Sequence, residues 1–202
     1  MPIIKNIDLF NPHDREKNRK FYLETRCMSL LYRRLLPTLK TEEYRGVFIN
    51  CLSSIDEIDD PYDDLYLMFD HLTIFIERDM NEYSCLSTNI EKKTYMLDAI
   101  QEGMEKAADQ LKWDKEILYK VYQQVVDFNY VNEYIYTKKS SPNRKYVCSI
   151  ICEHDVSHID VYIQVKKRYG KKVIGKEKIY RTRYTDEEYL FFSFWKSRMD
   201  KR

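Results

Sequence analysis

Residues 159–166 read Ile-Asp-Val-Tyr-Ile-Gln-Val-Lys, and this stretch decides the class of fold. Apolar and polar side chains alternate along it, so the isoleucines and valines point to one side of an extended chain and their neighbours to the other. Such alternation is typical of a strand with one buried face and one solvated face. The stretch therefore predicts a half-buried strand.

Three further strands flank this one in the sequence. After Asn129 the spacing of apolar residues changes from about 3.6 to 2, and residues 134–136, 146–154 and 173–184 have strand-like patterns. Their connections are short and contain Ser, Pro, Asn, Asp or Gly, which favour turns. Because antiparallel neighbours can be joined by such short links, the C-terminal part predicts an antiparallel meander.

Helices are expected before this sheet. One runs from about Asn11 to Pro37, a clear one starts near Ile90 with Thr88 or Asn89 as its cap, and another starts after Asp114. A strand is predicted from Tyr44 to Leu52. Residues 61–78 fit a helix or a strand, and their β-branched end favours a strand.

The chain end also has a helix signal, because Thr185 and Glu188 stand at the spacing of a capping box. The sequence thus predicts an α+β protein in which helices pack on an antiparallel β-meander. A single domain is expected over residues 1–202. Its parts would be a mainly helical and mixed region 1–130, a sheet 131–184 and a helix 185–198.

Composition narrows the function. The chain has 202 residues but only 4 Gly, which weighs against dinucleotide folds and phosphate-binding loops. No apolar run approaches the length of a membrane span, so no membrane partner is expected. The 5 Cys are an odd number in a chain long enough to form a core without disulfides. We expect reduced thiols, a cytoplasmic location and no cofactor.

A metal site has one candidate, formed by Cys148, Cys152, His154 and His158. These residue types ligate zinc, and they fall within eleven positions. The usual C-x2-C knuckle is missing, however, and a strand would place Cys148, Cys152 and His154 on the same face as Ile150. We therefore interpret the cysteines as core residues and expect no metal.

Opposite charges collect in different parts of the chain. Residues 1–143 carry 19 basic and 25 acidic side chains, whereas residues 144–202 carry 15 basic and 8 acidic ones. The formal net charge of +1 is therefore a cancellation. The densest acidic segment comprises Asp56, Glu57, Asp59, Asp60, Asp63 and Asp64. It is a solvated loop or a docking site for a basic partner.

The densest basic segment lies in the last hairpin and is interleaved with tyrosines. Its members are Lys166, Lys167, Arg168, Lys171, Lys172, Lys176, Lys178, Arg181 and Arg183. Basic and aromatic side chains together can follow a phosphate backbone and stack on bases. Lysines on an edge strand also serve to prevent pairing with other chains, which is the simpler interpretation.

Catalytic motifs are missing from the sequence. None of the four histidines lies in a recognisable hydrolase or zinc-protease motif. We therefore expect that the protein is not an enzyme. An unrecognised hydrolase or nuclease is the remaining enzymatic alternative, and His154 and His158 would be the first residues to substitute.

Four segments of the chain resemble bacterial immunity proteins of polymorphic-toxin and contact-dependent-inhibition systems. They are Ile90-Glu91-Lys92-Lys93, Leu111-Lys112-Trp113-Asp114, Ser141 to Tyr146, and Val147 to His154. The similar region, residues 74–195, covers about 60% of the chain. The resemblance implies a small cytoplasmic protein that binds a cognate toxin domain and blocks its active site or its access to substrate.

That resemblance gives the expected function, an immunity protein whose partner is a toxin domain, for example a nuclease. A nucleic-acid-binding accessory protein that uses the basic hairpin 166–183 is the alternative. The many tyrosines agree with a binding protein, since Tyr is frequent among residues that dominate interfaces. Neither the toxin nor the oligomeric state follows from the sequence.

Overall fold

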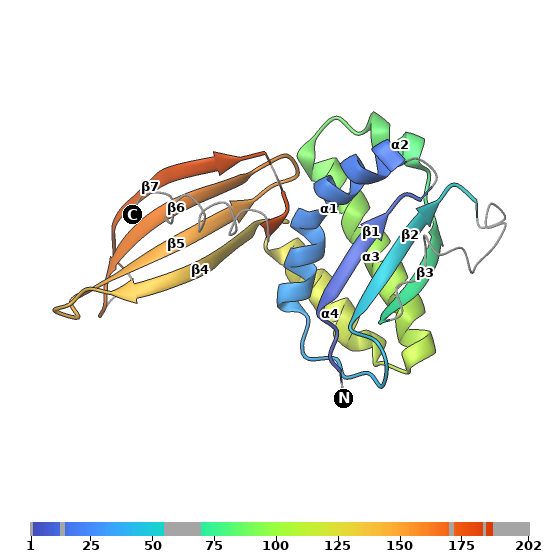
Figure 1. Ribbon diagram of the computed structural model, residues 1–202, viewed down its shortest axis with the longest axis horizontal. Coiled ribbons are helices and arrows are strands. Elements are labelled where there is room, and N and C mark those ends of the chain that lie inside the picture. Colours follow the sequence, from blue (N-terminus) through green and yellow to red (C-terminus); the bar gives the residue numbers. More distant parts are fainter. Residues whose placement is uncertain (1, 13–14, 55–69, 170–171, 184, 188–202) are drawn as a thin grey trace. The chain divides into compact units, whose positions relative to one another are not determined.

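The computed structural model describes residues 2–12, 15–54, 70–169, 172–183 and 185–187. It confirms the α+β class, with helices, a parallel sheet and an antiparallel sheet. The chain divides into two compact units, Met1–Tyr130 and Val131–Arg202, coloured blue to yellow-green and yellow to red in Figure 1. The boundary falls where the apolar period changes. Whether the two units unfold together as a single domain stays a prediction.

The first unit is built on a three-stranded parallel sheet in the order β1-β2-β3 (Figure 1). Its strands are β1 (Asn6–Phe10), β2 (Gly46–Leu52) and β3 (His71–Glu77). The central strand β2 is buried along almost its whole length, which agrees with its nearly continuous apolar sequence. The strand expected at Tyr44 to Leu52 is confirmed. Residues 71–77 of the ambiguous segment form a strand, and residues 61–69 lie outside the described residues.

The helices of this unit are α1 (Arg15–Leu35), α2 (Met80–Cys85), α3 (Asn89–Leu111) and α4 (Lys115–Asp127). Contacts join α1 to β1 and α3 to β2 and β3, so these helices pack on the parallel sheet. The approach of α3 is close at Gly103, where a Cβ atom would lie 2.5 Å from Cδ1 of Ile49. Glycine permits this distance and a larger residue does not.

Local signals set the helix starts. Thr88 and Glu91 form the complete capping box of α3, and the Asp114 side chain accepts the Glu116 N–H at the start of α4. Both predictions are confirmed. The first helix differs, because it starts at Arg15 and not near Asn11. Asn11 follows β1 directly, and its N–H donates to the Asn18 side chain. β1 and the short helix α2 were not among the elements predicted from the sequence.

The second unit is the antiparallel meander that the sequence predicts. Its strands are β4 (Asn132–Ser140), β5 (Tyr146–His154), β6 (Ile159–Lys167) and β7 (Val173–Thr182), in that order. Register pairs such as Cys152 with Val161 fix which side chains share a face. Of the predicted helix 185–198, only Thr185 to Glu187 is described. Within the described residues, no helix has the length and apolar character that crossing a membrane requires.

Candidate binding surface of the antiparallel sheet

Alternation along the four strands gives the antiparallel sheet two different faces. One face carries the core cluster of Cys152, Ile159 and Val161, against which Tyr134 and Ile150 pack. The other carries the alternate residues along each strand, which are mostly charged or polar. Of these, Ile151, Asp160 and Gln164 are buried. Burial of one face and solvation of the other is the ordinary arrangement of an antiparallel sheet. The charged groups of the sheet are therefore concentrated on one face.

Charged residues on the polar face form a set of ion pairs that we call the ion-pair ladder. Its members are Glu133, Glu153, Asp160, Lys176, Lys178 and Arg181. They come from all four strands. Antiparallel pairing brings them together, because Glu133 lies opposite Glu153, Glu153 opposite Asp160, and Asp160 opposite Arg181.

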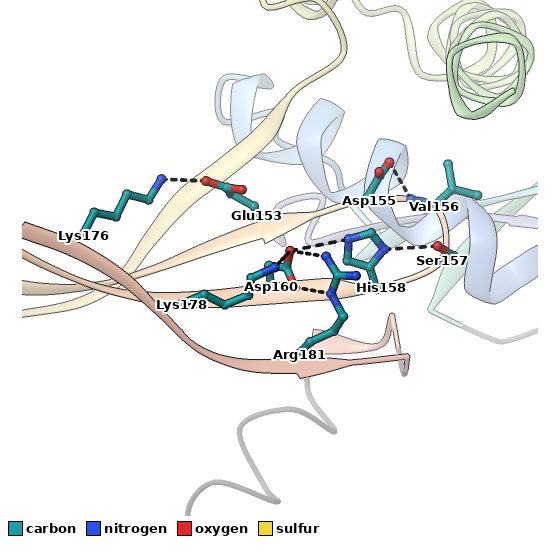
Figure 2. Close-up of polar contacts among 9 residues, drawn as sticks. All are labelled: Glu153, Asp155, Val156, Ser157, His158, Asp160, Lys176, Lys178 and Arg181. Atoms are coloured by element: carbon teal, nitrogen blue, oxygen red, sulfur yellow. Dashed lines mark hydrogen bonds and ion pairs between the residues drawn. The ribbon is translucent and has the colours of Figure 1, made fainter.

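Asp160 is the centre of one part of the ladder (Figure 2). Its carboxylate accepts two hydrogen bonds of 2.6 Å from Nε and Nη2 of Arg181 and one of 3.1 Å from Lys178 Nζ. The side chain of Asp160 is only 7% exposed, whereas that of Arg181 is 52% exposed. The hydrogen bonds from Arg181, helped by Lys178, outweigh burial and lower the pKa of Asp160 well below its usual range. At neutral pH Asp160 is therefore an ionised anchor for two cations.

Lys176 forms the other part of the ladder. Its ammonium lies 2.6 Å from Oε1 of Glu153 and 3.1 Å from Oε2 of Glu133, and 4.5 Å from the centre of the Tyr162 ring. Burial alone would raise the pKa of Glu153, but the hydrogen bond and charge of Lys176 lower it overall. The lysine thus holds two carboxylates side by side that would otherwise repel each other.

The ladder divides the predicted basic segment in two. Lys176, Lys178 and Arg181 are paired with carboxylates of the same sheet. Lys166, Lys167, Arg168 and Lys172 lie at the other end of β6 and β7, near the turn. Arg183 is exposed just beyond β7, and Lys171 lies outside the described residues. The predicted segment is therefore not one continuous basic surface.

The β4–β5 hairpin adds four basic residues that lie outside the predicted basic segment. The turns of the two hairpins lie at the same end of the sheet (Figure 1), and the Arg168 N–H donates to the Lys145 carbonyl at 2.9 Å. We call the resulting group the basic tip. It consists of Lys138, Lys139, Arg144, Lys145, Lys166, Lys167, Arg168 and Lys172. In an antiparallel meander, the first and third turns lie at the same end of the sheet, so the predicted strand order already implied that these two turns are neighbours.

Within the described ranges, the basic tip has no acidic counterpart. No Asp or Glu occurs between Tyr134 and Cys152, or between Val161 and Lys176. Among the residues that the structure describes, no ion pair joins a carboxylate to any of the eight basic side chains. The tip is therefore a concentrated positive surface, in contrast to the neutralised ladder.

Two tyrosines border an open hollow at this tip. The hollow has a volume of about 450 Å³ and is lined by Asn143, Arg144, Lys145, Tyr146, Lys167 and Tyr169. Tyr169 is 84% exposed, and its ring centre lies 5.8 Å from the Arg168 guanidinium carbon. An aromatic ring this exposed contributes little to the protein's own packing.

The two edge strands of the sheet expose further apolar side chains. Ile135 and Tyr136 on β4 are 57% and 48% exposed, and Ile174 and Ile179 on β7 are 52% and 47% exposed. Nine of the ten residues of β7 are exposed. Apolar side chains along an open sheet edge are typical of surfaces that contact another protein.

The four candidate metal ligands do not converge. Cys152 lies in the core cluster, and His154 is buried with its Nδ1 3.0 Å from Oε1 of Glu187. His158 contacts Asp160, whose side chain is on the opposite face of the sheet from Cys152. Within the described ranges, no three His, Cys, Asp or Glu side chains are grouped as a metal ion requires.

Ser157, His158 and Asp160 supply the residue types of a hydrolytic triad (Figure 2). Ser157 Oγ lies 3.1 Å from His158 Nδ1, but His158 Nε2 is 3.6 Å from the Asp160 carboxylate. That distance exceeds a hydrogen bond, and the carboxylate is already held by Arg181 and Lys178. The arrangement gives Asp160 a role in the ladder and does not favour the hydrolase alternative.

The remaining predicted site, the acidic segment from Asp56 to Asp64, lies outside the described residues and stays a prediction.

Comparison of the chain with protein-family models, with curated proteins and with solved structures finds no match.

Proposed function

We propose that this protein is a binding protein of the immunity class, which neutralises a bacterial toxin domain by direct contact. The observation that carries the proposal is the exposure of apolar and aromatic side chains on both edge strands of the antiparallel sheet. The resemblance of the sequence to immunity proteins supplies the class of partner.

The edge strand β7 is suited to a specific partner. Its outer backbone groups have no neighbouring strand in the described part of the sheet, and Ile174 and Ile179 are half exposed. A partner that packs there would bury apolar area and gain backbone hydrogen bonds. Lysines on the same strand, such as Lys178, disfavour indiscriminate pairing between edges. This combination supports binding to a complementary surface and resistance to aggregation.

The acidic segment supplies a second expectation about the partner. Several carboxylates between Asp56 and Asp64 would attract a toxin with a basic substrate groove, such as a nuclease, and speed their encounter. Neutralising Asp59, Asp60, Asp63 and Asp64 together should slow association and weaken its salt dependence. Unchanged association kinetics would remove this part of the proposal.

The test is neutralisation of a toxin in living cells. Each protein encoded beside this chain's gene is expressed alone and together with this chain. We expect one of them to stop growth when it is alone and to be harmless when it is co-expressed. If no neighbouring protein is toxic, or if toxicity persists on co-expression, the proposal is wrong.

Substitutions then locate the surface. Ile174→Glu with Ile179→Glu should weaken toxin binding by about 30-fold or more, because hot-spot truncations at interfaces cost roughly 2 kcal/mol or more. The matched control is Ile90→Glu, since Ile90 is 46% exposed but lies on α3. An equal loss from Ile90→Glu, or no loss from the double variant, would contradict the assignment to β7.

A further inference from the structure

We infer that the basic tip binds single-stranded nucleic acid, with phosphates on its lysines and arginines and a base stacked on Tyr169 or Tyr146. This site is separate from the β7 surface proposed to meet a toxin, and either can exist without the other. It also differs from the predicted segment 166–183, because residues of the ladder are excluded from it and the β4–β5 hairpin is included.

Charge supplies the first argument. The eight basic side chains of the tip belong to the ends of two hairpins, which are joined by the hydrogen bond from the Arg168 N–H to the Lys145 carbonyl. Nothing acidic among the described residues neutralises them, whereas the ladder neutralises Lys176, Lys178 and Arg181. Exposed cations held close together create a positive potential that attracts an anion with several charges. A phosphate backbone is such an anion.

The backbone of Arg144 supplies the second argument. Its φ angle is 56°, in the left-handed region that favours glycine. Hydrogen bonds of the turn hold it there, including one of 2.8 Å from the Arg144 N–H to the Ser141 carbonyl. Lys112, Asn129 and Tyr130 adopt the same region of φ, so the angle alone does not indicate a function. Here the turn fixes the arginine on the lining of the hollow, beside Lys145 and Tyr146.

The exposed rings supply the third argument. Tyr169 is 84% exposed and Tyr146 is 39% exposed, and both line a hollow of about 450 Å³. Proteins that bind single strands combine a positive groove with aromatic rings on which bases stack. Duplex bases are already stacked on each other, so rings in this position favour a single strand. An acidic protein surface could pair with the basic side chains of the tip, but it has no bases to stack on the tyrosine rings.

The test measures binding of a fluorescent single-stranded oligouridylate about 15 nucleotides long by anisotropy, at about 50 and 200 mM salt. Polyglutamate of similar charge is the competing probe. We expect the purified full chain to bind the RNA, with affinity that falls steeply with salt, and to bind polyglutamate at least about tenfold more weakly.

The tip variant carries Lys145→Gln, Lys166→Gln, Lys167→Gln and Arg168→Gln. It should bind RNA at least about 30-fold more weakly, with a shallower salt slope, since each lost phosphate contact removes roughly 0.7 from that slope. The matched control removes four exposed lysines of the first unit, by Lys20→Gln, Lys40→Gln, Lys115→Gln and Lys120→Gln. It has the same net charge as the tip variant and should bind RNA like the natural chain.

Tyrosine substitutions separate nucleic acid from other polyanions. Tyr169→Ala should weaken RNA binding by about tenfold and leave polyglutamate binding unchanged, because only a base can stack on the ring. Tyr119→Ala on α4, where the ring is 58% exposed, is the matched control and should have no effect.

Several outcomes would overturn the inference. They are absence of RNA binding at low salt, equal losses in the tip variant and its control, or polyglutamate binding as tight as RNA binding. The last result would assign the tip to an acidic protein. Each result is independent of the growth assay, so failure here would not affect the proposed toxin binding.

Discussion

The two ends of the antiparallel sheet use the same residue types in opposite ways. At one end, Lys176, Lys178 and Arg181 meet carboxylates from neighbouring strands. At the other, eight basic side chains meet none among the described residues. Seven of these eleven cations, from Lys166 to Arg181, fall in one stretch of the sequence, and the other four lie in the β4–β5 hairpin. The difference shows that the strand register decides whether a basic residue stabilises the sheet or remains available to a ligand.

The ion-pair ladder and the basic tip also differ in their exposure to solvent. Asp160 is nearly buried, so its bonds to Arg181 form in a setting where water screens them less. The tip residues Lys166, Lys167 and Arg168 are exposed, and their charges are screened by water and salt. Stability should therefore respond strongly to changes in the ladder and weakly to changes in the tip. Binding should show the reverse.

The largest expected change in stability comes from Asp160→Asn. The amide cannot balance two cations, so the free energy of unfolding should fall by about 2–3 kcal/mol. Urea denaturation at about pH 7 measures this change. Asp109→Asn is the control, because Asp109 is 64% exposed and pairs with Lys115 at the surface. Its effect should stay under about 0.5 kcal/mol. Equal losses would contradict a special role for the ladder.

The stability of the folded chain at acid pH should also depend on the Asp160 carboxylate. The pKa of Asp160 in the folded chain is lowered from its ordinary 3.8. Its contribution is therefore complete above this ordinary value and is lost as the pH falls through the lowered pKa. The natural chain should lose more stability than Asp160→Asn between about pH 5 and pH 2. Parallel stability curves for the two proteins over this interval would argue against the lowered pKa.

A change of the opposite sign is expected at the tip. Arg144→Gly should raise the free energy of unfolding by about 1 kcal/mol, because glycine adopts the left-handed conformation without strain. Arg144→Ala removes the charge but keeps the Cβ atom, so it should give little or no gain. Thermal unfolding compares the two variants. A similar gain in both would assign the effect to charge repulsion and not to the backbone.

The smallest effect is expected from Lys176→Gln. Lys176 bridges Glu133 and Glu153, but its side chain is 29% exposed and those carboxylates are 47% and 37% exposed. Water compensates much of the lost attraction, so unfolding should become easier by about 0.5–1 kcal/mol. Raising the salt concentration should reduce the difference between this variant and the natural chain. A loss as large as that of Asp160→Asn would mean that exposure does not separate the two parts of the ladder.

Local sequence signals located most of the described elements. The strands of the meander were visible in their alternation, as in residues 159–166, and α3 and α4 in their caps at Thr88 and Asp114. These signals act over a few residues, so a single sequence contains them. The basic residues of the last hairpin were also visible, though not their division into two groups.

The parallel sheet had no comparable signal. β1 is only five residues long, and the whole of α1 separates it in the sequence from its partner β2. No short-range pattern therefore predicts this strand. The choice of the sheet on which the helices pack also depends on contacts between residues far apart in the sequence. The close contact of Gly103 with Ile49 joins residues 54 positions apart. Tertiary packing overrides local preference in such regions.

By itself, the sequence determined the α+β class, the meander and the total charge, because each depends on composition or on patterns a few residues long. Only the tertiary structure decided which charges neutralise each other. Antiparallel register brings Asp160 beside Arg181, and the turn of Arg144 beside that of Arg168. Ion pairs depend on distances of a few ångströms. Those distances are set by strand pairing between segments far apart in the chain, and the spacing of charges along the sequence does not contain them.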